Sequence, residues 1–424
     1  MNQSKRVLFV GYRGKQAHIE PVRLAGITLF LLIEEKEMKD EYLSLFENVF
    51  TVKDSFDWKE ILSVIKDFQF DGVLTRYEDF IEQTSALAEY FGAKGIDFKN
   101  SVNFRNKYLM KKAFVASGVP SADFALISSF DEVAPFLEKH SFPLILKQIS
   151  GIHSKFVTKV NSPEDLKKTL FDFQKQLPQS SDNLQKKFSN YPKSTETPNP
   201  LTHFLLEECV VGMELTIDTF VVGSEMFFTP ICRYILPEEV GIDDVCLPIR
   251  IMPCDLNAEE EKFILKIVEK GLRALGADYC ATHTEVFYDR GKGEAHIIEI
   301  AARGGGFRAE MCEAARGDDY NLVVVNAALG IQPQLSEKHL AYAAVVEVFS
   351  PRNGKLAKID YSVLKNQKDI SHLTINKKID EEVGLARNGK SFIVKFLLKA
   401  DNYESARRRS IEFLNEVRKT IVVK

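Results

Sequence analysis

A chain of 424 residues is too long for one ordinary compact domain and long enough for two to four. Hydrophobic residues make up 45% of the chain, enough to build sizeable cores, which excludes general disorder. Its 56 Lys and Arg residues against 60 Asp and Glu residues give a net charge of −4, so it lacks the basic excess typical of a nucleic-acid binder. The composition therefore predicts small-molecule partners and no nucleic acid.

Cysteine spacing and the N-terminal pattern indicate the cellular setting. The six cysteines, from Cys209 to Cys312, contain no CxxC pair, which argues against a disulfide framework or a zinc knuckle and favours buried thiols in a reducing compartment. The apolar run in MNQSKRVLFVG has the length of a strand rather than of a signal-peptide core, and no run approaches the ~18 apolar residues that span a membrane. We expect a cytoplasmic protein without membrane contact.

The first hundred residues alternate strand and helix patterns. Val7–Val10, Ile27–Ile33 and Asp71–Thr75 are short, mostly apolar runs, and a helical pattern covers Asp79–Phe91. Such alternation is typical of a parallel sheet covered by helices. We therefore predict an N-terminal Rossmann-like domain over residues 1–102.

Two loops of this domain follow predicted strands. Gly11-Tyr-Arg-Gly-Lys15 lies where a Rossmann domain has its phosphate loop, but it lacks GxGxxG, so we interpret it as a tight turn. Arg76, Glu78 and Asp79 follow the third strand at its carboxyl end, where open α/β sheets bind ligands. Substrate contact is one interpretation of these three residues, and an ordinary solvated loop is the preferred one.

The middle of the chain combines a helix, two strands and a polar segment. A helix is predicted over Asn103–Ser117, followed by a Gly and Pro stop signature. The strand Pro143–Lys147 leads into the loop 148–155, and a second strand begins at Phe156. Residues 178–200 hold four prolines among polar residues, so we interpret them as a mobile excursion without assigned chemistry.

Strand patterns dominate from Leu201 onward. A long helix and a final helix interrupt them, and the last ninety residues are expected to form a separate α+β piece. The predicted strands are 204–207, 214–222, 226–235, 279–288, 295–303, 341–349 and 391–398, and the predicted helices are 258–275 and 403–417.

Two glutamates in a predicted hairpin carry the chemistry. If Tyr288 pairs with His296 across the turn, Glu285 lies directly opposite Glu299, with Cβ atoms ~4.5–5.5 Å apart. Two carboxylates this close repel unless a cation lies between them, and oxygen ligands suit Mg²⁺. A one-residue slip would place the two on opposite faces. The alternative is a solvated glutamate pair, which the isoleucines around Glu299 argue against.

Further groups extend this candidate site. Period 2 places Ala301 and Arg303 on the face of Glu299, ahead of three glycines. Mg²⁺ on one or two carboxylates usually keeps phosphates as further ligands, and phosphates bind lysines and backbone N–H groups. Lys147 and the turn after it offer both, and Glu214 is suited to ribose hydroxyls.

The order of these features resembles the ATP-grasp superfamily over roughly residues 5–335. Asn106-Lys107 resembles its opening lysine segment, and Phe142–Lys147 resembles its second lysine strand, which a phosphate-covering loop follows. Glu207–Val210 resembles the adenine-binding hinge. The resemblance implies metal ligands at Glu285 and Glu299 and ATP contacts from Lys107, Lys147, Ser150, His153, Ser154, Glu207, Glu208, Cys209, Val210 and Glu214.

The segment Glu299-Ile-Ala-Ala-Arg-Gly-Gly-Gly306 is most similar to the carboxylate–amine ligase branch, which includes L-amino-acid ligases and carnosine-synthase-like enzymes. In that branch the arginine four residues after the metal glutamate stabilises the acyl phosphate and its tetrahedral adduct, which implies a catalytic role for Arg303. Gly305, Gly306 and Arg308 are candidate substrate contacts. Arg308 is expected either as a clamp for a substrate carboxylate or as a helix-surface arginine.

The chain departs from the family pattern at two points. Ala301 stands where the branch has a metal-supporting Asn, which leaves open whether one or two metal ions bind. The phosphate loop has Gly151 as its single glycine, with His153 and Ser154 where a Gly/Ser-rich run is usual.

The resemblance implies an ATP-dependent ligase that joins a carboxylate, from an amino acid or another small acid, to an amine. The reaction would pass through an acyl phosphate and release ADP and phosphate, with ATP and Mg²⁺, or alternatively Mn²⁺, as cofactors. A purine-pathway-type carboxylase or formyltransferase and a non-catalytic nucleotide-binding regulatory protein are the alternatives. No local motif names the acid or the amine, and a homodimer is left open.

The predicted architecture is an ATP-grasp fold of mixed α/β and α+β class. It has the Rossmann-like domain 1–102, an ATP-grasp domain 103–335 and a small C-terminal α+β domain 336–424. Within the ATP-grasp domain, we expect a small phosphate-loop lobe at about 120–205 and a large metal-site lobe at about 206–335.

Overall fold

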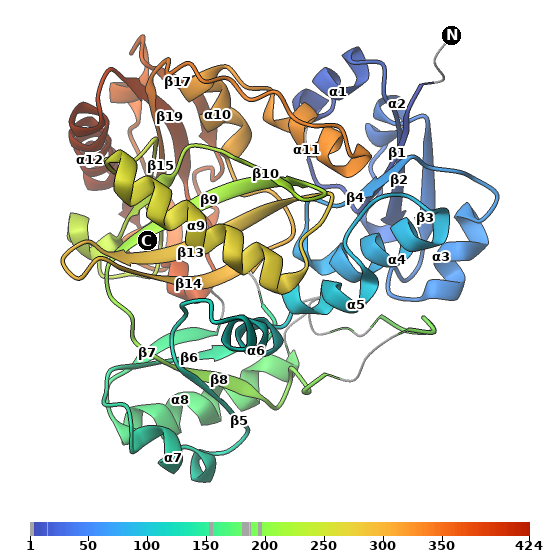
Figure 1. The fold of residues 1–424 in the computed structure, drawn as a ribbon. Helices are drawn as coiled ribbons and strands as arrows, with labels where there is room; N and C mark the ends of the chain where they lie inside the picture. Colours follow the sequence, from blue (N-terminus) through green and yellow to red (C-terminus); the bar gives the residue numbers. More distant parts are fainter. Residues whose placement is uncertain (1–3, 15, 152–155, 180–185, 187, 194–196) are drawn as a thin grey trace.

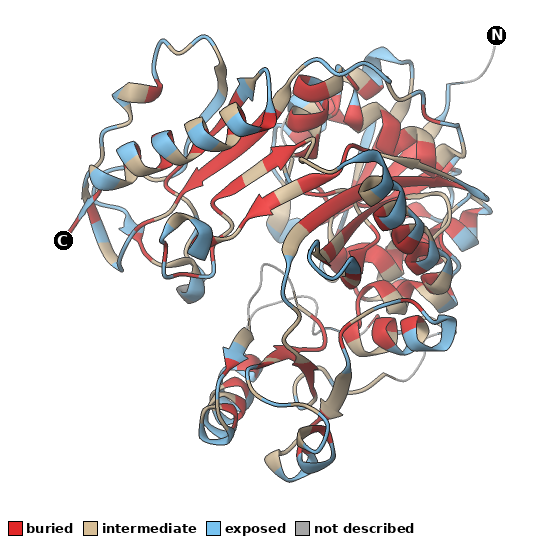
Figure 2. Ribbon diagram, turned by 60° about the vertical axis from the view of Figure 1, so that its left-hand side comes forward, coloured by how far each residue is buried: buried red, intermediate tan, exposed pale blue. Residues whose placement is uncertain are grey.

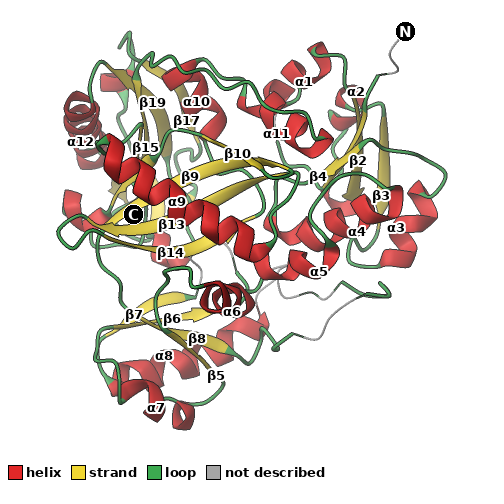
Figure 3. Cartoon of the chain, in the orientation of Figure 1, coloured by secondary structure: helices red, strands yellow, loops and turns green. Residues whose placement is uncertain are grey.

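A computed structural model describes residues 4–14, 16–151, 156–179, 186, 188–193 and 197–424. Over these ranges the strands form four sheets. Figure 1 shows three bodies: an N-terminal body, a small lobe, and a central body built on a long sheet. Helices and strands are mixed in each body (Figure 3). Within the described part of the chain, no helix is both long and apolar enough to cross a membrane. The six cysteines are free thiols.

The N-terminal body is a parallel sheet of order β3-β2-β1-β4, as the alternating pattern predicts. Its strands are apolar because helices cover both faces, and the red strands of this body in Figure 2 show that burial. The elements are β1 (Arg6–Val10), β2 (Thr28–Glu34), β3 (Asn48–Val52), β4 (Gly72–Leu74), α1 (Glu20–Leu24), α2 (Tyr42–Leu45), α3 (Trp58–Ile65), α4 (Ile81–Phe91) and α5 (Phe98–Ser101).

The small lobe is an antiparallel sheet of order β5-β8-β6-β7 with helix α6 between it and the central sheet (Figure 1). The Asn106 side chain caps α6 by accepting bonds from the amides of Tyr108 and Leu109, and the helix ends at Gly118 with φ +62°. The elements are α6 (Lys107–Ser117), β5 (Phe124–Ile127), α7 (Ala134–Leu137), β6 (Leu144–Gln148), β7 (Val157–Val160), α8 (Pro163–Gln176) and β8 (Phe204–Glu208).

The central sheet has nine strands in the order β14-β13-β9-β11-β12-β15-β19-β17, with β10 paired to β9. The run 226–235, predicted as one strand, is two strands with Pro230 between them, because proline donates no ladder hydrogen bond. The elements are β9 (Met213–Val222), β10 (Glu225–Phe228), β11 (Cys232–Ile235), β12 (Ile249–Met252), α9 (Ala258–Leu275), β13 (Cys280–Asp289), β14 (Glu294–Ala301), α10 (Arg308–Arg316) and α11 (Tyr320–Leu329).

The two faces of this sheet bury different helices. Helix α9 packs on one face against Ile217, Val286 and Ile297, whereas α10 and α11 pack on the other face against Phe220 and Ala281. Alternation along β9 therefore places Thr216 and Asp218 on the α10 side, together with the functional residues described below.

The C-terminal ninety residues extend the central sheet, because β15 pairs with β12 and β19 pairs with β15. Helix α12 packs against these strands, and a small sheet of order β18-β16-β20 lies beside them. No break in the sheet marks the predicted boundary at 335/336. The elements are β15 (Tyr342–Val348), β16 (Gly354–Lys358), β17 (Ile370–Ile375), β18 (Glu382–Val383), β19 (Val394–Ala400), α12 (Tyr403–Lys419) and β20 (Val422–Val423).

The described part of the polar segment 178–200 is anchored on the N-terminal body. Phe188 is buried in its core, and the rings of Phe188 and Tyr191 pack against Trp58 with centroids 6.0 and 4.9 Å away. The amide of Trp58 donates to the Ser189 carbonyl at 3.1 Å. These aromatic contacts fasten the chain that follows α8 to the N-terminal body.

We predict that Phe188→Ala removes this anchor. Truncating a buried Phe costs about 3–5 kcal/mol through lost burial and the cavity that remains. A lower melting temperature and faster proteolysis in the 178–200 segment are expected. Phe171→Ala is the matched control, because Phe171 is 64% exposed and its truncation should leave both measurements unchanged. Equal behaviour of the two variants would contradict the anchoring role.

Candidate active site

The β13–β14 hairpin brings Glu285 and Glu299 directly opposite each other. The turn pairing differs from the prediction, because Tyr288 pairs with Ala295 and not with His296. A bulge between Glu285 and Val286 restores the register, since Val286 pairs with Ile297 and one residue of β14 is left over. The two carboxylates therefore share one face of the sheet.

The surroundings of the two opposed carboxylates shift their pKa values in opposite directions. Burial and the neighbouring Glu299 raise the pKa of Glu285 above its usual value. Burial alone would raise the pKa of Glu299 too, but the Lys107 ammonium, 2.6 Å from its Oε1, more than offsets this and lowers that pKa. The side chains stay 34% and 20% exposed, so a ligand can reach both.

Lys107, at the start of α6, is the first predicted phosphate lysine. Its buried ammonium also donates to the Gly151 carbonyl at 3.2 Å, so it bridges the hairpin and the loop after β6. Ser150 in that loop is buried. The predicted contacts His153 and Ser154 lie outside the described residues. The described end of the loop is thus fixed beside the facing carboxylates.

Lys147, the second predicted lysine, projects from β6 toward Glu207 of β8. Their charged atoms are 2.7 Å apart, and Lys111 of α6 lies 3.4 Å from the other oxygen of Glu207. All three side chains are buried. Glu207 therefore faces the lysines, whereas Glu208 faces outward and accepts a bond from the Asp123 amide at 2.9 Å.

The predicted hinge joins the small lobe to the central sheet. Cys209 and Val210 follow the last residue of β8 and precede β9, and both are half-buried. Gly212 has φ +150°, and a Cβ there would lie 2.6 Å from the Tyr288 carbonyl oxygen, so this crossing requires glycine. Burial and the charge of Glu285 raise the pKa of Glu214 to about 8. Glu214 thus lies within electrostatic reach of Glu285.

Arg303, predicted as catalytic, reaches across to the N-terminal body. Its Nη2 donates to Glu78 Oε2 at 3.0 Å, and its Nη1 donates to the Gly304 carbonyl at 3.0 Å. Glu78 and Asp79 are buried, so the preferred prediction of a solvated loop after β4 is wrong at both residues. The carboxyl end of the parallel sheet thereby becomes one wall of the site.

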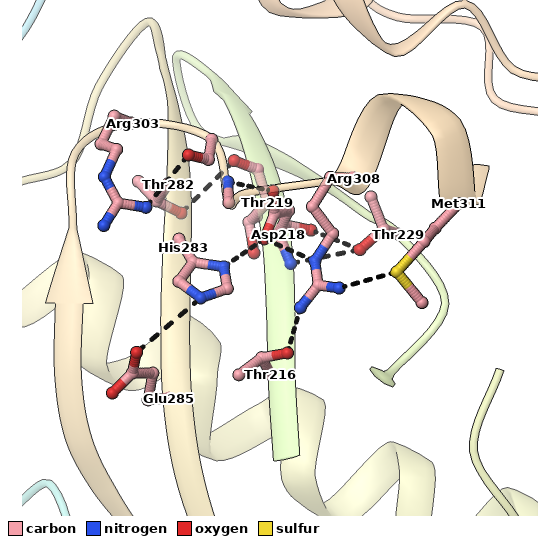
Figure 4. A network of polar contacts seen from close by, with 12 residues as sticks. Thr216, Asp218, Thr219, Thr229, Thr282, His283, Glu285, Arg303, Arg308 and Met311 are labelled. Carbon is pink, nitrogen blue, oxygen red and sulfur yellow. Dashed lines mark hydrogen bonds and ion pairs between the residues drawn. The ribbon is translucent and has the colours of Figure 1, made fainter. Parts of the chain in front are cut away.

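Arg308 requires a correction. Its side chain is fully buried, and its guanidinium donates to Asp218 and Thr216 (Figure 4). It also donates to the Tyr234 hydroxyl. A substrate carboxylate has no access to it in this arrangement, so neither the clamp nor the helix-surface interpretation holds. The arginine is instead the buried counter-ion of Asp218.

Asp218 is the centre of a buried polar network under the glycine loop (Figure 4). Its carboxylate accepts bonds from Gly305 N at 2.7 Å and from the Tyr320 hydroxyl, and lies 2.5 Å from Nδ1 of His283. His283 Nε2 lies 3.9 Å from Glu285 Oε1. Gly305 fits tightly, because a Cβ there would lie 2.5 Å from the His283 ring, whereas Gly306 is exposed.

Sequence reasoning missed Asp218, His283 and the role of Glu78. Period-2 alternation could have placed the first two, since Asp218 lies four residues after Glu214 and His283 two before Glu285 in predicted strands. No local signal identifies Glu78 as the partner of Arg303, because 225 residues separate them.

The residues fit a divalent cation that is completed by other ligands. Within the described residues, no group of three or more His, Cys, Asp or Glu side chains is placed to hold a metal ion. The facing carboxylates of Glu285 and Glu299 supply one or two oxygen ligands each, and their mutual repulsion is relieved by a cation. Mg²⁺ is typically bound by such a pair plus substrate phosphates.

Comparison with known proteins agrees with this geometry. Residues 140–311 match the ATP-grasp domain family, and they include Lys147, the hinge, both facing glutamates and Arg303. Over these residues the chain is therefore similar to the ATP-grasp domain family, as its sequence features indicate.

The relatives include ligases of amino acids. The chain is 26% identical to alanine–anticapsin ligase of Bacillus subtilis (strain 168) over 264 residues, covering 59% of this chain and 52% of that protein. It thus spans about half the length of this relative. An L-amino acid ligase from Bacillus licheniformis superposes with TM-score 0.78 at 19% identity over 100% of both chains. An ADP complex of N5-carboxyaminoimidazole ribonucleotide synthetase gives 0.72 at 16% over 98% of both. These likenesses confirm the ATP-grasp fold.

We predict that Asp218→Asn destabilises the protein. Removing one partner of a buried ion pair typically costs about 3–5 kcal/mol, because Arg308 keeps an uncompensated charge. Tyr320→Phe is the matched control, since it removes one hydrogen bond to the carboxylate, worth about 1.5–3 kcal/mol, and keeps the charge. Chemical denaturation should rank the parent, Tyr320→Phe and Asp218→Asn in falling stability, and an equal loss would contradict the ion-pair role.

The pH dependence of this effect follows from the pKa of Asp218. Burial alone would raise that pKa, but the His283 imidazole and the Arg308 guanidinium more than offset it and hold it well below the ordinary value. The ionised carboxylate therefore stabilises the fold above its unfolded pKa of ~3.9, and the contribution is lost as the pH falls below that value. The stability difference between parent and Asp218→Asn should therefore be present at about pH 5 and shrink below about pH 4.

Proposed function

We propose that this protein is an ATP-dependent carboxylate–amine ligase that activates an amino acid or another small acid as an acyl phosphate and transfers the acyl group to an amine. The observation that carries the proposal is the convergence of Glu285, Glu299 and Arg303 beside two buried lysines. A cytoplasmic location and a homodimer belong to the same proposal.

Nucleotide binding is assigned to the residues where the small lobe meets the central sheet. Lys107 and Lys147 would bind the phosphates, since ammonium groups and backbone N–H donors are suited to them. The hinge backbone at Cys209 and Val210 would contact adenine, and Glu214 would accept bonds from ribose hydroxyls. Mg²⁺ on Glu285 and Glu299 would neutralise negative charge on the terminal phosphates.

Activation requires the substrate carboxylate to lie near the γ-phosphate, on the Arg303 side of the facing glutamates. Arg303 is suited to this place, because its planar guanidinium offers several donors in a fixed fork. In the structure one of its nitrogens is bonded to Glu78 and another to the loop backbone. A substrate carboxylate or acyl-phosphate oxygen would accept hydrogen bonds from this guanidinium in place of Glu78.

Glu78 would then recognise the positive end of an amino acid. It is buried next to Arg303, and an ammonium group is the complementary partner for its carboxylate once Arg303 turns to the acyl oxygen. Attack of the amine on the acyl phosphate forms the C–N bond and releases phosphate, and Arg303 would stabilise the oxyanion of the tetrahedral adduct.

The discriminating experiment measures ADP and phosphate release against pools of amino acids, other carboxylates and amines, with product masses read afterwards. Coupled release of ADP and phosphate with a mass equal to acid plus amine minus water is expected. Release of AMP and pyrophosphate would contradict the acyl-phosphate route. Turnover that requires a ribonucleotide would favour the purine-pathway alternative. ATP binding without turnover in any pool would favour a regulatory protein.

Glu299→Gln is expected to abolish Mg²⁺-dependent turnover while the protein stays folded. The amide keeps the side-chain shape but removes a charge that the cation needs. If the two glutamates have no part in cation binding, the same change would leave turnover intact. The melting temperature and the ATPase rate, measured on one preparation, separate these two results.

Arg303→Lys is expected to separate binding from chemistry. The charge is kept, so affinity for the Mg²⁺ complex of ATP should stay near that of the parent. Losing one fixed oxyanion donor typically costs ~2.7–4 kcal/mol, so kcat should fall by about 10²–10³. Steady-state kinetics and calorimetry with ATP measure the two effects. Parental kcat would exclude Arg303 as the oxyanion group, and a collapse of ATP affinity would make it a nucleotide ligand.

A further inference from the structure

Helix α6 lies against the small-lobe sheet (Figure 1). In the interior between them, two ammonium groups share one carboxylate. Lys147 of β6 lies 2.7 Å from Oε2 of Glu207, and Lys111 of α6 lies 3.4 Å from Oε1. The residues are 4%, 0% and 3% exposed for Lys147, Lys111 and Glu207. The cluster is therefore fully internal, and it carries one more positive than negative charge.

Glu207 is ionised in this cluster. Burial alone would raise the pKa of its carboxyl, but Lys147 and Lys111 more than offset this and lower it. A buried carboxylate that loses its partner is costly, because neither water nor another charge compensates it. Glu207 therefore needs a cation in every state of the protein, including the state in which nucleotide is bound.

Nucleotide binding would place a phosphate in competition with Glu207 for one of its two cations. If Lys147 binds the phosphates of ATP, its ammonium divides its donors between phosphate and carboxylate, and the 2.7 Å contact with Glu207 weakens. Lys111 is placed to compensate for this loss. Its 3.4 Å separation from Glu207 is longer than an ordinary hydrogen bond, so it can move closer when Lys147 moves away.

Position on the helix separates Lys111 from its neighbours. Lys107, one turn earlier on the same helix face, is engaged with Glu299 and Gly151. Lys112 is exposed. Burial lowers the pKa of Lys111 to about 8, and the carboxylate of Glu207 opposes this shift.

We propose that Lys111 is a positioning residue for nucleotide binding: it neutralises Glu207 so that Lys147 can exchange this carboxylate for the phosphates of ATP. The inference rests on the proposed function, because it takes Lys147 to be a phosphate ligand. Lys111 acts through Glu207 and Lys147 and does not itself contact the nucleotide.

A double-mutant cycle tests this exchange. The measured quantity is the Kd of the Mg²⁺ complex of a non-hydrolysable ATP analogue, obtained by calorimetry on the full chain. Lys111→Met should raise Kd at least about 10-fold, because Lys147 would have to abandon an uncompensated buried charge. Glu207→Gln removes the carboxylate that Lys111 neutralises, and its Kd is the reference for the second half of the cycle. Adding Lys111→Met to Glu207→Gln should then change Kd less than about threefold, since no carboxylate remains to be neutralised.

The matched control is Lys112→Met, the same chemical change one residue further along α6 at an exposed position. It should leave Kd at the parental value. If Lys111→Met alone does not fold, Lys111→Gln, which removes the charge and keeps a polar side chain, takes its place in the cycle. A purely structural lysine would lower the melting temperature and leave Kd unchanged.

Each other result overturns the inference. An unchanged Kd in Lys111→Met would show that Glu207 needs no second cation. A loss of affinity that persists in the Glu207→Gln background would make Lys111 a direct nucleotide ligand. No binding by the unsubstituted protein would overturn the proposed function and this inference together, whereas normal binding without coupling between positions 111 and 207 would overturn this inference alone.

Discussion

The direct opposition of Glu285 and Glu299 is the constraint around which the rest of the site is arranged. Two carboxylates on neighbouring strands repel, and partial burial strengthens the repulsion because the local dielectric is low. The ammonium of Lys107, which belongs to α6 and not to the sheet, lies 2.6 Å from Glu299 and offsets this repulsion. Helix α6 leads into the small lobe. The Lys107–Glu299 ion pair, which relieves the repulsion between the two glutamates, therefore also connects the small lobe to the central sheet.

Ion pairs between buried or half-buried side chains also connect the other parts of the molecule. Arg303 of the central body pairs with Glu78 of the N-terminal body, and Lys111 and Lys147 share Glu207 between α6 and the small-lobe sheet. A ligand with phosphates, a carboxylate and an ammonium could replace the protein partner in each pair. Lys107 and Lys147 would exchange carboxylates for phosphates while Lys111 stays with Glu207, and Arg303 would exchange Glu78 for an acyl oxygen. Charges that are already buried and oriented need little reorganisation for this exchange, which is the condition for strong electrostatic catalysis.

Local patterns were sufficient for the elements but not for partners distant in sequence. The parallel sheet, helix α9 and the shared face of the two glutamates follow from apolar runs, capping residues and period 2. Glu78 could not be assigned, because its partner Arg303 is brought to it only by the packing of α11 against β4 and β13. Arg308 was assigned wrongly for a related reason: an arginine after a glycine run carries no sign of whether it turns toward solvent or toward a buried aspartate.

The bulge in β14 lets the hairpin bury Ile297 and Ile300 on one face and still place Glu299 opposite Glu285, which simple alternation would not allow. Ile297 and Ile300 are three residues apart, so a regular strand would place them on opposite faces, yet both are fully buried on the α9 side. The residue left over at the bulge, Ile298, lets both contact α9 at Gly271, where a Cβ would lie 2.4 and 3.0 Å from their Cδ1 atoms. Glu299 between them is thereby turned to the opposite face. The packing of the sheet against α9 and the position of Glu299 opposite Glu285 therefore both depend on this bulge. The bulge also offsets the one-residue error in the predicted turn pairing, so the predicted pair of Glu285 and Glu299 is correct.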